Sequence, residues 1–189
     1  MMYNELNVSL IDIDGVACEH AKAICKWVND EYKINSKVED VTTWNHNFGN
    51  ITFVDAVKRC YRSEDFILNM EITQGFHGFL KQLTKMMTVK FATTREEYCH
   101  NATRLWIEKH FGEEFEILFV DKKADLSFDY LVDDSPDEVM VAASKCEACF
   151  LLSRPWNNNG DTKSKLNKIK RVHFVGSFTD IINFLDSDV

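Results

Sequence analysis

The stretch VSLIDIDGV, residues 8–16, decides how we interpret the fold. Its apolar residues predict a buried strand over residues 8–13, and Gly15 allows the chain to leave that strand sharply. Because side chains alternate along a strand, Asp12 and Asp14 are expected on the same side, at the carboxyl end. In open α/β sheets this end of the strands is where ligands bind.

Five further short apolar runs predict strands, and longer stretches with helical spacing separate most of them. The predicted strands are 89–92, 117–120, 130–132, 149–152 and 172–175, and the predicted helices of this part are 97–111, 137–145 and 177–185. Strands that alternate with helices indicate a parallel sheet covered on both faces. The expected fold class is therefore α/β: a doubly wound, mostly parallel, Rossmann-like sheet.

The interval from Gly15 to Thr88 is much longer than the ~12 residues that a plain crossover needs. It predicts helices at 17–32, 53–61, 63–70 and 75–85, the last of which serves as the crossover. We expect a core made of residues 1–16 and 75–189, and a small helical cap inserted at 17–74. Residues 155–163 (PWNNNGDTK) are the best candidate for a flexible loop.

Composition excludes several classes of protein. The chain has 189 residues, 22 Lys and Arg against 30 Asp and Glu, and a net charge of −8. This balance weighs against binding to nucleic-acid polymers or anionic membranes, which requires a basic face. No apolar run approaches the roughly 18 residues of a membrane span. The first ten residues lack a basic leader, and the six scattered cysteines fit reduced thiols, so we expect a cytoplasmic protein.

Acidic, hydroxyl and amine groups follow several of the predicted strands. Asp12 and Asp14 end the first, Thr93–Thr94 the second and Asp133–Asp134 the fourth, with Lys123 shortly before the fourth. Four carboxylates in one crevice repel one another unless a cation neutralises them, and oxygen ligands suit Mg²⁺. Lys123 and the hydroxyl and N–H groups of the two threonines offer donors to phosphate oxygens. The pattern predicts a magnesium-dependent site for a phosphate ester.

These residues also support a resemblance to a known family. The order DxDGV, strand plus Thr, Lys and then DD resembles the haloacid dehalogenase (HAD) superfamily of phosphatases that use an aspartate nucleophile. Residues 91–116 (FATTREEYCHNATRLWIEKHFGEEFE), KADLSFDYLVDDSP at 123–136 and the insertion directly after DIDGV are similar to the 5'(3')-deoxyribonucleotidase-like branch. The resemblance implies a 5'-nucleotidase that acts on (deoxy)nucleoside monophosphates through an aspartyl-phosphate. Dimers are familiar among similar proteins, but no residue of the sequence indicates an interface.

The resemblance also implies a role for each residue of the pattern. Asp12 would be the nucleophile and Asp14 the general acid and base, while Thr93 and Lys123 would hold the phosphate. The Mg²⁺ ligands would be Asp12, the backbone carbonyl of Asp14 and Asp134. Asp133 would lie beside the ion or behind its direct ligands.

Several alternatives stay open at this level. Trp44, Phe48 and Phe76 are candidates for a pocket that binds the base, whereas most aromatic residues of the insertion are expected in its core. The loop that contains Trp156 could reach substrate or be anchored by this residue. Cys146 and Cys149 have CxxC spacing, but lack a second pair of zinc ligands and are expected in the core.

Other functions stay open as well. The site would also suit a phosphatase for another small metabolite. A receiver-like protein and a non-catalytic phosphate-binding protein are less favoured alternatives.

Overall fold

The computed structural model describes residues 7–187. Part of the expectation about a leader concerns residues 1–6, which lie outside the described residues. The described residues form a six-stranded, fully parallel sheet in the order β3-β2-β1-β4-β5-β6. The strands are β1 (Val8–Ile11), β2 (Thr88–Thr93), β3 (Glu116–Phe119), β4 (Tyr130–Asp133), β5 (Ala148–Leu152) and β6 (Val172–Val175). All six correspond to predicted strands.

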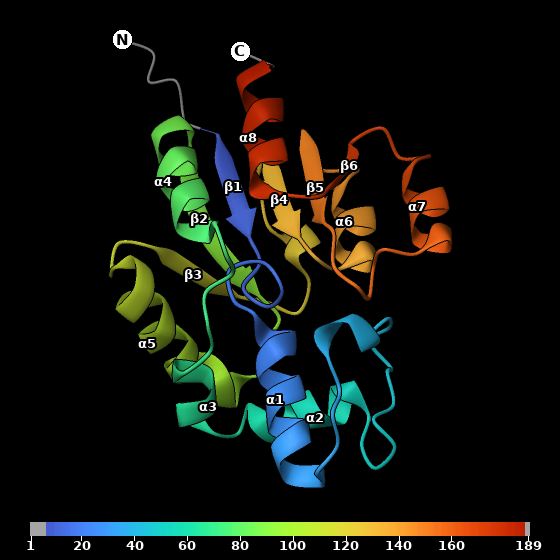
Figure 1. The fold of residues 1–189 in the computed structure, drawn as a ribbon. Helices are drawn as coiled ribbons and strands as arrows, with labels where there is room; N and C mark the ends of the chain where they lie inside the picture. Colours follow the sequence, from blue (N-terminus) through green and yellow to red (C-terminus); the bar gives the residue numbers. More distant parts are fainter. Residues whose placement is uncertain (1–6, 188–189) are drawn as a thin grey trace.

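Helices cover both faces of the sheet because both faces are apolar. Ile11 belongs to one buried cluster and its neighbour Leu10 to another, as strand alternation requires. The helices α4 (Phe76–Met86), α5 (His100–Phe111) and α8 (Phe178–Ser187) contribute to the first cluster, and α6 (Pro136–Ala142) and α7 (Gly160–Leu166) to the second (Figure 1). The predicted α/β class with a doubly wound parallel sheet is confirmed.

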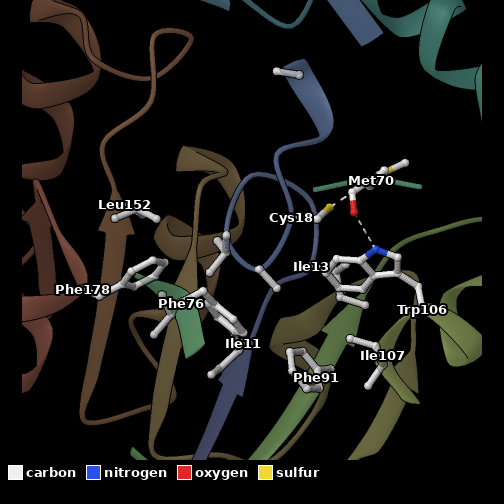
Figure 2. Close-up of a cluster of buried hydrophobic side chains, with 14 of the residues drawn as sticks. Ile11, Ile13, Cys18, Met70, Phe76, Phe91, Trp106, Ile107, Leu152 and Phe178 are labelled. Atoms are coloured by element: carbon white, nitrogen blue, oxygen red, sulfur yellow. Dashed lines mark hydrogen bonds between the residues drawn. The ribbon is translucent and has the colours of Figure 1, made fainter. Parts of the chain in front are cut away.

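Large aromatic and branched side chains fill the first cluster (Figure 2). Phe91 of β2 and Phe76 of α4 lie with ring centroids 6.2 Å apart, and both are fully buried. Trp106 of α5 is buried, and its indole Nε1 donates a hydrogen bond of 3.0 Å to the carbonyl oxygen of Met70. This bond satisfies the polar atom of a buried tryptophan and ties the chain before α4 to α5.

The helices of the insertion lie beyond the carboxyl ends of the strands (Figure 1). They are α1 (His20–Tyr32), a 3₁₀ turn (Val38–Asp40), α2 (Phe53–Cys60) and α3 (Glu64–Leu68). The two connections to this segment run side by side: the backbone N–H of Glu19 donates to Glu71, and that of Thr73 donates to Ala17, both at 2.9 Å. The division into a core and a cap at 17–74 stays a prediction.

The expectation of a flexible loop over residues 155–163 is wrong in its second half. Helix α7 begins at Gly160, and the side chain of Asn159 accepts a hydrogen bond from the backbone N–H of Thr162. Asparagine is a preferred residue at this position because it satisfies an otherwise unpaired N–H group.

The six cysteines are free and buried, including Cys146 and Cys149, whose sulfur atoms are 3.2 Å apart. In the part of the chain that the structure describes, we find no helix with the length and apolar character needed to cross a bilayer.

Candidate active site

The carboxyl ends of the central strands border a cleft of about 410 Å³, which residues of α1 and α2 line from the other side. The predicted catalytic, phosphate-binding and metal-binding residues all line this cleft: Asp12, Asp14, Thr93, Thr94, Lys123, Asp133 and Asp134. The fold therefore gathers into one place residues that are up to 122 positions apart in the sequence, since β1 pairs with both β2 and β4.

The buried ammonium group of Lys123 joins two of the carboxylates. Its Nζ donates to Oδ1 of Asp12 and to Oδ2 of Asp133, both at 2.6 Å. Burial alone would lower the pKa of Lys123, but the two carboxylates outweigh burial and hold this pKa above its usual value. Lys123 is therefore a fixed positive charge beside Asp12.

Both oxygens of Asp133 are already in use. Oδ2 accepts from Lys123, and Oδ1 accepts a hydrogen bond of 2.8 Å from the backbone N–H of Ser135. The residue is completely buried at the end of β4. These contacts suit a side chain that orients Lys123 better than one that ligates an ion directly.

Asp12 and Asp134 each keep one carboxylate oxygen that no hydrogen bond within residues 7–187 uses. Lys123 donates to Oδ1 of Asp12, and the indole Nε1 of Trp156 donates to Oδ2 of Asp134 at 3.0 Å. Burial, followed by the charges of Asp12 and Asp133, holds the pKa of Asp134 well above its usual range. Burial likewise raises the pKa of Asp12 to about 7, although Lys123 opposes the shift.

These acids fit a metal ion. Ligand atoms of Asp12, Asp133 and Asp134 lie within 4.8 Å of one another, and all three residues are buried. A bound cation would stabilise the ionised form of acids that burial and mutual repulsion disfavour. The all-oxygen donor set is the kind that hard divalent ions prefer.

Asp14 has a different environment, since its charge is neutralised by protein groups. Arg95 donates from Nε to Oδ2 (2.9 Å) and from Nη2 to Oδ1 (2.7 Å), and the hydroxyl of Tyr61 donates to Oδ1 at 2.5 Å. Burial would raise the pKa of Asp14, but mainly Arg95, with a smaller contribution from the hydrogen bond of Tyr61, outweighs burial and holds this pKa below its usual range. Asp14 is thus a carboxylate at neutral pH.

Thr93 is the last residue of β2, and Thr94 follows it. Thr93 is buried, and its hydroxyl accepts a hydrogen bond of 3.3 Å from the backbone N–H of Arg95, which leaves the hydroxyl proton free for another acceptor. Thr94 is exposed on the cleft. Both threonines are therefore available to an anionic ligand.

Only one of the three aromatic candidates for a base-binding pocket lines the cleft. Trp44 lines the cleft, whereas Phe48 and Phe76 are not among its lining residues. Phe76 is fully buried against Phe79 and Phe178 of the core, so its prediction as a pocket residue is wrong. Phe48 is also buried and packs on other residues of the insertion, which removes it from the candidate pocket.

Sequence reasoning missed several residues of the cleft. Arg95 and Tyr61 hold Asp14, and His20 lies against Trp44 with ring centroids 5.6 Å apart. Burial lowers the pKa of His20 to about 4, so its imidazole is neutral. The position of Arg95 directly after Thr93–Thr94 was the only feature of the sequence that could have indicated its place in the cleft. The contact between Trp156 and Asp134 resolves the open alternative in favour of an anchored loop.

The fold is that of the haloacid dehalogenase-like hydrolases, as comparison with solved structures shows. A HAD family hydrolase from Deinococcus radiodurans, solved with bound phosphate and sodium, superposes with a TM-score of 0.68 at 14% identity over 96% of each chain. A haloacid dehalogenase-like hydrolase from Streptococcus pneumoniae gives 0.66 at 11% identity, over 95% of this chain and 98% of its own. The chain thus has the fold of the HAD class.

Within that class, the chain belongs to the family described as 5' nucleotidase, deoxy (pyrimidine), cytosolic type C protein, whose model matches residues 6–173. The mitochondrial 5'(3')-deoxyribonucleotidase of Mus musculus is 33% identical over 84 residues. This match covers 41% of the present chain and 38% of the mouse protein, well under half of either. The recognition of a HAD superfamily phosphatase similar to the deoxyribonucleotidases is confirmed.

Proposed function

We propose that the protein is a Mg²⁺-dependent phosphomonoesterase that hydrolyses 5'-(deoxy)nucleoside monophosphates through an aspartyl-phosphate. The observation that carries the proposal is the pairing of Asp12 with the fixed charge of Lys123 in a cleft that also contains Asp134 with one free oxygen. Membership of the nucleotidase family supports a small phosphate ester as the substrate.

We assign Asp12 as the nucleophile. Lys123 holds its Oδ1, which leaves Oδ2 to attack phosphorus and to form the acyl-phosphate as the alcohol leaves. Lys123 and the hydroxyl groups of Thr93 and Thr94 would donate to the oxygens of the transferring group. Mg²⁺ held by Asp134, the backbone carbonyl of Asp14 and Oδ1 of Asp12, which has a second lone pair besides the one that accepts from Lys123, would neutralise phosphate charge.

Asp14 is assigned the proton transfers. As a carboxylate held by Arg95 and Tyr61, it suits the second step, in which a base takes a proton from the water that attacks the acyl-phosphate. To protonate the departing oxygen in the first step, its carboxyl group must release Arg95 and gain a proton. This requirement makes the leaving-group ability of the alcohol important for the first step.

The remaining proposals concern the surroundings of the site. Residues 17–74 would act as a cap that selects the substrate, with Trp44 and the neutral His20 lining the cleft on that side. Asp133 would orient Lys123 from behind the ion. We also propose that the protein is cytoplasmic and retain a homodimer as an expectation from the family.

The deciding experiment measures turnover of mononucleotides, sugar phosphates and an aryl phosphate with Mg²⁺ and with EDTA. We expect release of phosphate from mononucleotides that EDTA abolishes, and a loss on the order of 10³-fold or more for Asp12→Asn. Asp121→Asn, at an exposed position two residues before Lys123 and outside the lining of the cleft, is the control and should keep wild-type turnover. A folded Asp12→Asn variant with full activity would refute the nucleophile, and a preference for sugar phosphates would refute the nucleotide substrate.

A further inference from the structure

A second cleft, of about 510 Å³, lies between α4 and α8 and shares no lining residue with the candidate active site. We call it the α4–α8 cleft. Thr73, Gly75 and Gly78 line it from the beginning of α4, and Arg154, Gly176 and Asn183 line it from the side of β5 and α8. The two helices lie side by side in front of the sheet (Figure 1).

The cleft contains a guanidinium group, that of Arg154, that forms no ion pair with any residue of 7–187, although its charge acts to lower the pKa of Asp134. Arg154 is half-buried, and its Nε donates a hydrogen bond of 2.6 Å to the carbonyl oxygen of Gly15. No ion pair or hydrogen bond among residues 7–187 uses its terminal nitrogens, and Nη2 is buried. Because buried polar groups in folded proteins are nearly always hydrogen-bonded, an unpaired guanidinium nitrogen indicates a missing acceptor.

A second unpaired donor lies in the same wall. Thr73 is only 5% exposed, and its hydroxyl oxygen has no hydrogen-bond partner in the described part of the chain. The oxygen is covered, so it can reach a ligand in the cleft only if the side chain rotates about the Cα–Cβ bond. Rotation between staggered positions is an ordinary side-chain motion.

The first turn of α4 adds backbone donors. Its N-cap residue, Gly75, provides no side-chain cap. The N–H of Phe76 donates to the carbonyl oxygen of Thr73 at 3.0 Å, whereas the N–H groups of His77 and Gly78 keep their capacity to bind an acceptor. A Cβ atom at Gly78 would meet nothing within 4 Å, and one at Gly75 would meet only Phe178 at 3.8 Å, so the backbone here is open to the cleft. At the start of α8, by contrast, Asp180 already accepts from the N–H groups of Gly176 and Ser177, the two residues before the helix.

We propose that the α4–α8 cleft is a second, non-catalytic site for a phosphate group, either inorganic phosphate or the phosphate of a monoester. A guanidinium, a hydroxyl and the N-terminus of an eleven-residue helix form a set made of donors, which suits an oxyanion. The one acid in the lining, Asp186, lies near the opposite end of α8. The volume exceeds that of phosphate alone, so the body of an ester would lie along Phe79 and Ile182.

Arg154 connects this second phosphate site to the candidate active site, although the second site does not depend on the proposed reaction. Arg154 donates to the carbonyl of Gly15, the residue that follows Asp14. A phosphate that binds Arg154 from the cleft therefore contacts a side chain that already supports the turn after the candidate nucleophile.

The first test locates the anion directly. Crystals of the full chain are soaked in tungstate, a heavy analogue of phosphate, and its anomalous signal is measured. We expect one peak beside Asp12 and Lys123 and a second beside Arg154 and Thr73. A peak beside Lys123 alone overturns the proposal, and a peak beside Arg154 alone supports it while contradicting the phosphate site of the proposed function.

The second test measures affinity by calorimetry in Mg²⁺, with inorganic phosphate in one arm and a non-hydrolysable mononucleotide phosphonate in the other. Arg154→Gln should weaken one of two binding events about tenfold or more, and Thr73→Val the same event about fivefold. The controls Arg104→Gln on α5 and Thr84→Val on α4, both exposed, should change neither event.

Tighter binding of the phosphonate than of phosphate at the second site identifies an ester as the ligand, and the reverse identifies free phosphate. Binding that Arg154→Gln and Thr73→Val leave unchanged overturns the proposal.

Discussion

Replacement of Lys123 by methionine tests the electrostatic core of the site. The substitution removes two hydrogen bonds of 2.6 Å and leaves the carboxylates of Asp12 and Asp133 buried without their shared cation. Removal of one partner from a buried ion pair costs about 3–5 kcal/mol, because the remaining charge stays desolvated. We therefore expect the free energy of unfolding to fall by about this amount at pH 8 in EDTA.

The loss should be smaller at low pH. Burial already raises the pKa of Asp12 to about 7, and without Lys123 this pKa rises further. A group whose pKa is higher in the folded than in the unfolded protein contributes stability at low pH and loses it as pH rises through the folded value. Near pH 5 Asp12 binds a proton in the variant, which relieves part of the repulsion.

The assay is urea denaturation followed by circular dichroism, at pH 5 and pH 8. The neighbouring Lys122 is exposed, so Lys122→Met is a matched control whose effect should stay within about 0.5 kcal/mol. If Lys123→Met costs no more than Lys122→Met at pH 8, or costs more at pH 5 than at pH 8, the assignment of Lys123 as the cation shared by Asp12 and Asp133 is refuted.

Three further predictions concern the same site. Burial raises the pKa of both Asp12 and Asp134, so the protein in EDTA should gain thermal stability as pH falls from 8 to 5. Mg²⁺ should therefore raise the melting temperature more at pH 8 than at pH 5. An equal effect of Mg²⁺ at both pH values contradicts this prediction. Gly15→Ala combines a φ of +75° with a Cβ that would clash with Oδ2 of Asp134, and should lower the free energy of unfolding in urea by about 3 kcal/mol or more. Gly49→Ala, where φ is +100° but the space is open, should cost about 1 kcal/mol, and similar costs for the two variants would show that Asp134 gives way freely. Trp156→Phe removes the donor to Asp134 and should weaken Mg²⁺ binding about tenfold in calorimetry, and unchanged affinity would mean that the indole does not orient this ligand.

The strands and the order of the chemical groups could be predicted from sequence because both depend on local signals. A short apolar run that ends in polar residues is sufficient to place a strand and its carboxyl end, as in VSLIDIDGV before the turn at Gly15. The rule that ligands bind at that end of a parallel sheet then predicts that Asp12, Thr93 and Lys123 lie together. In the described structure, all three residues line one cleft.

What could not be predicted depends on contacts between distant segments. Arg95 pairs with a carboxylate 81 positions away, and nothing in its neighbours distinguishes it from a surface arginine. Phe76 is an aromatic residue close to the insertion in sequence, which is all that the sequence indicates, but the side of α4 that meets Phe178 decides its burial. The loop at 155–163 contains an asparagine cap whose helix has weak apolar periodicity, so polarity suggested flexibility there.

The paired connections at Glu19–Glu71 and Ala17–Thr73 have an evolutionary consequence. A segment whose exit and re-entry points are hydrogen-bonded to each other can be lengthened, shortened or exchanged without moving the strand that precedes it. Loop-closure entropy grows only slowly with length, so such exchanges are thermodynamically mild. With the roles proposed above, selectivity for the alcohol part of a substrate can then diverge among descendants of one ancestor, while the proposed reacting groups on the sheet are inherited unchanged.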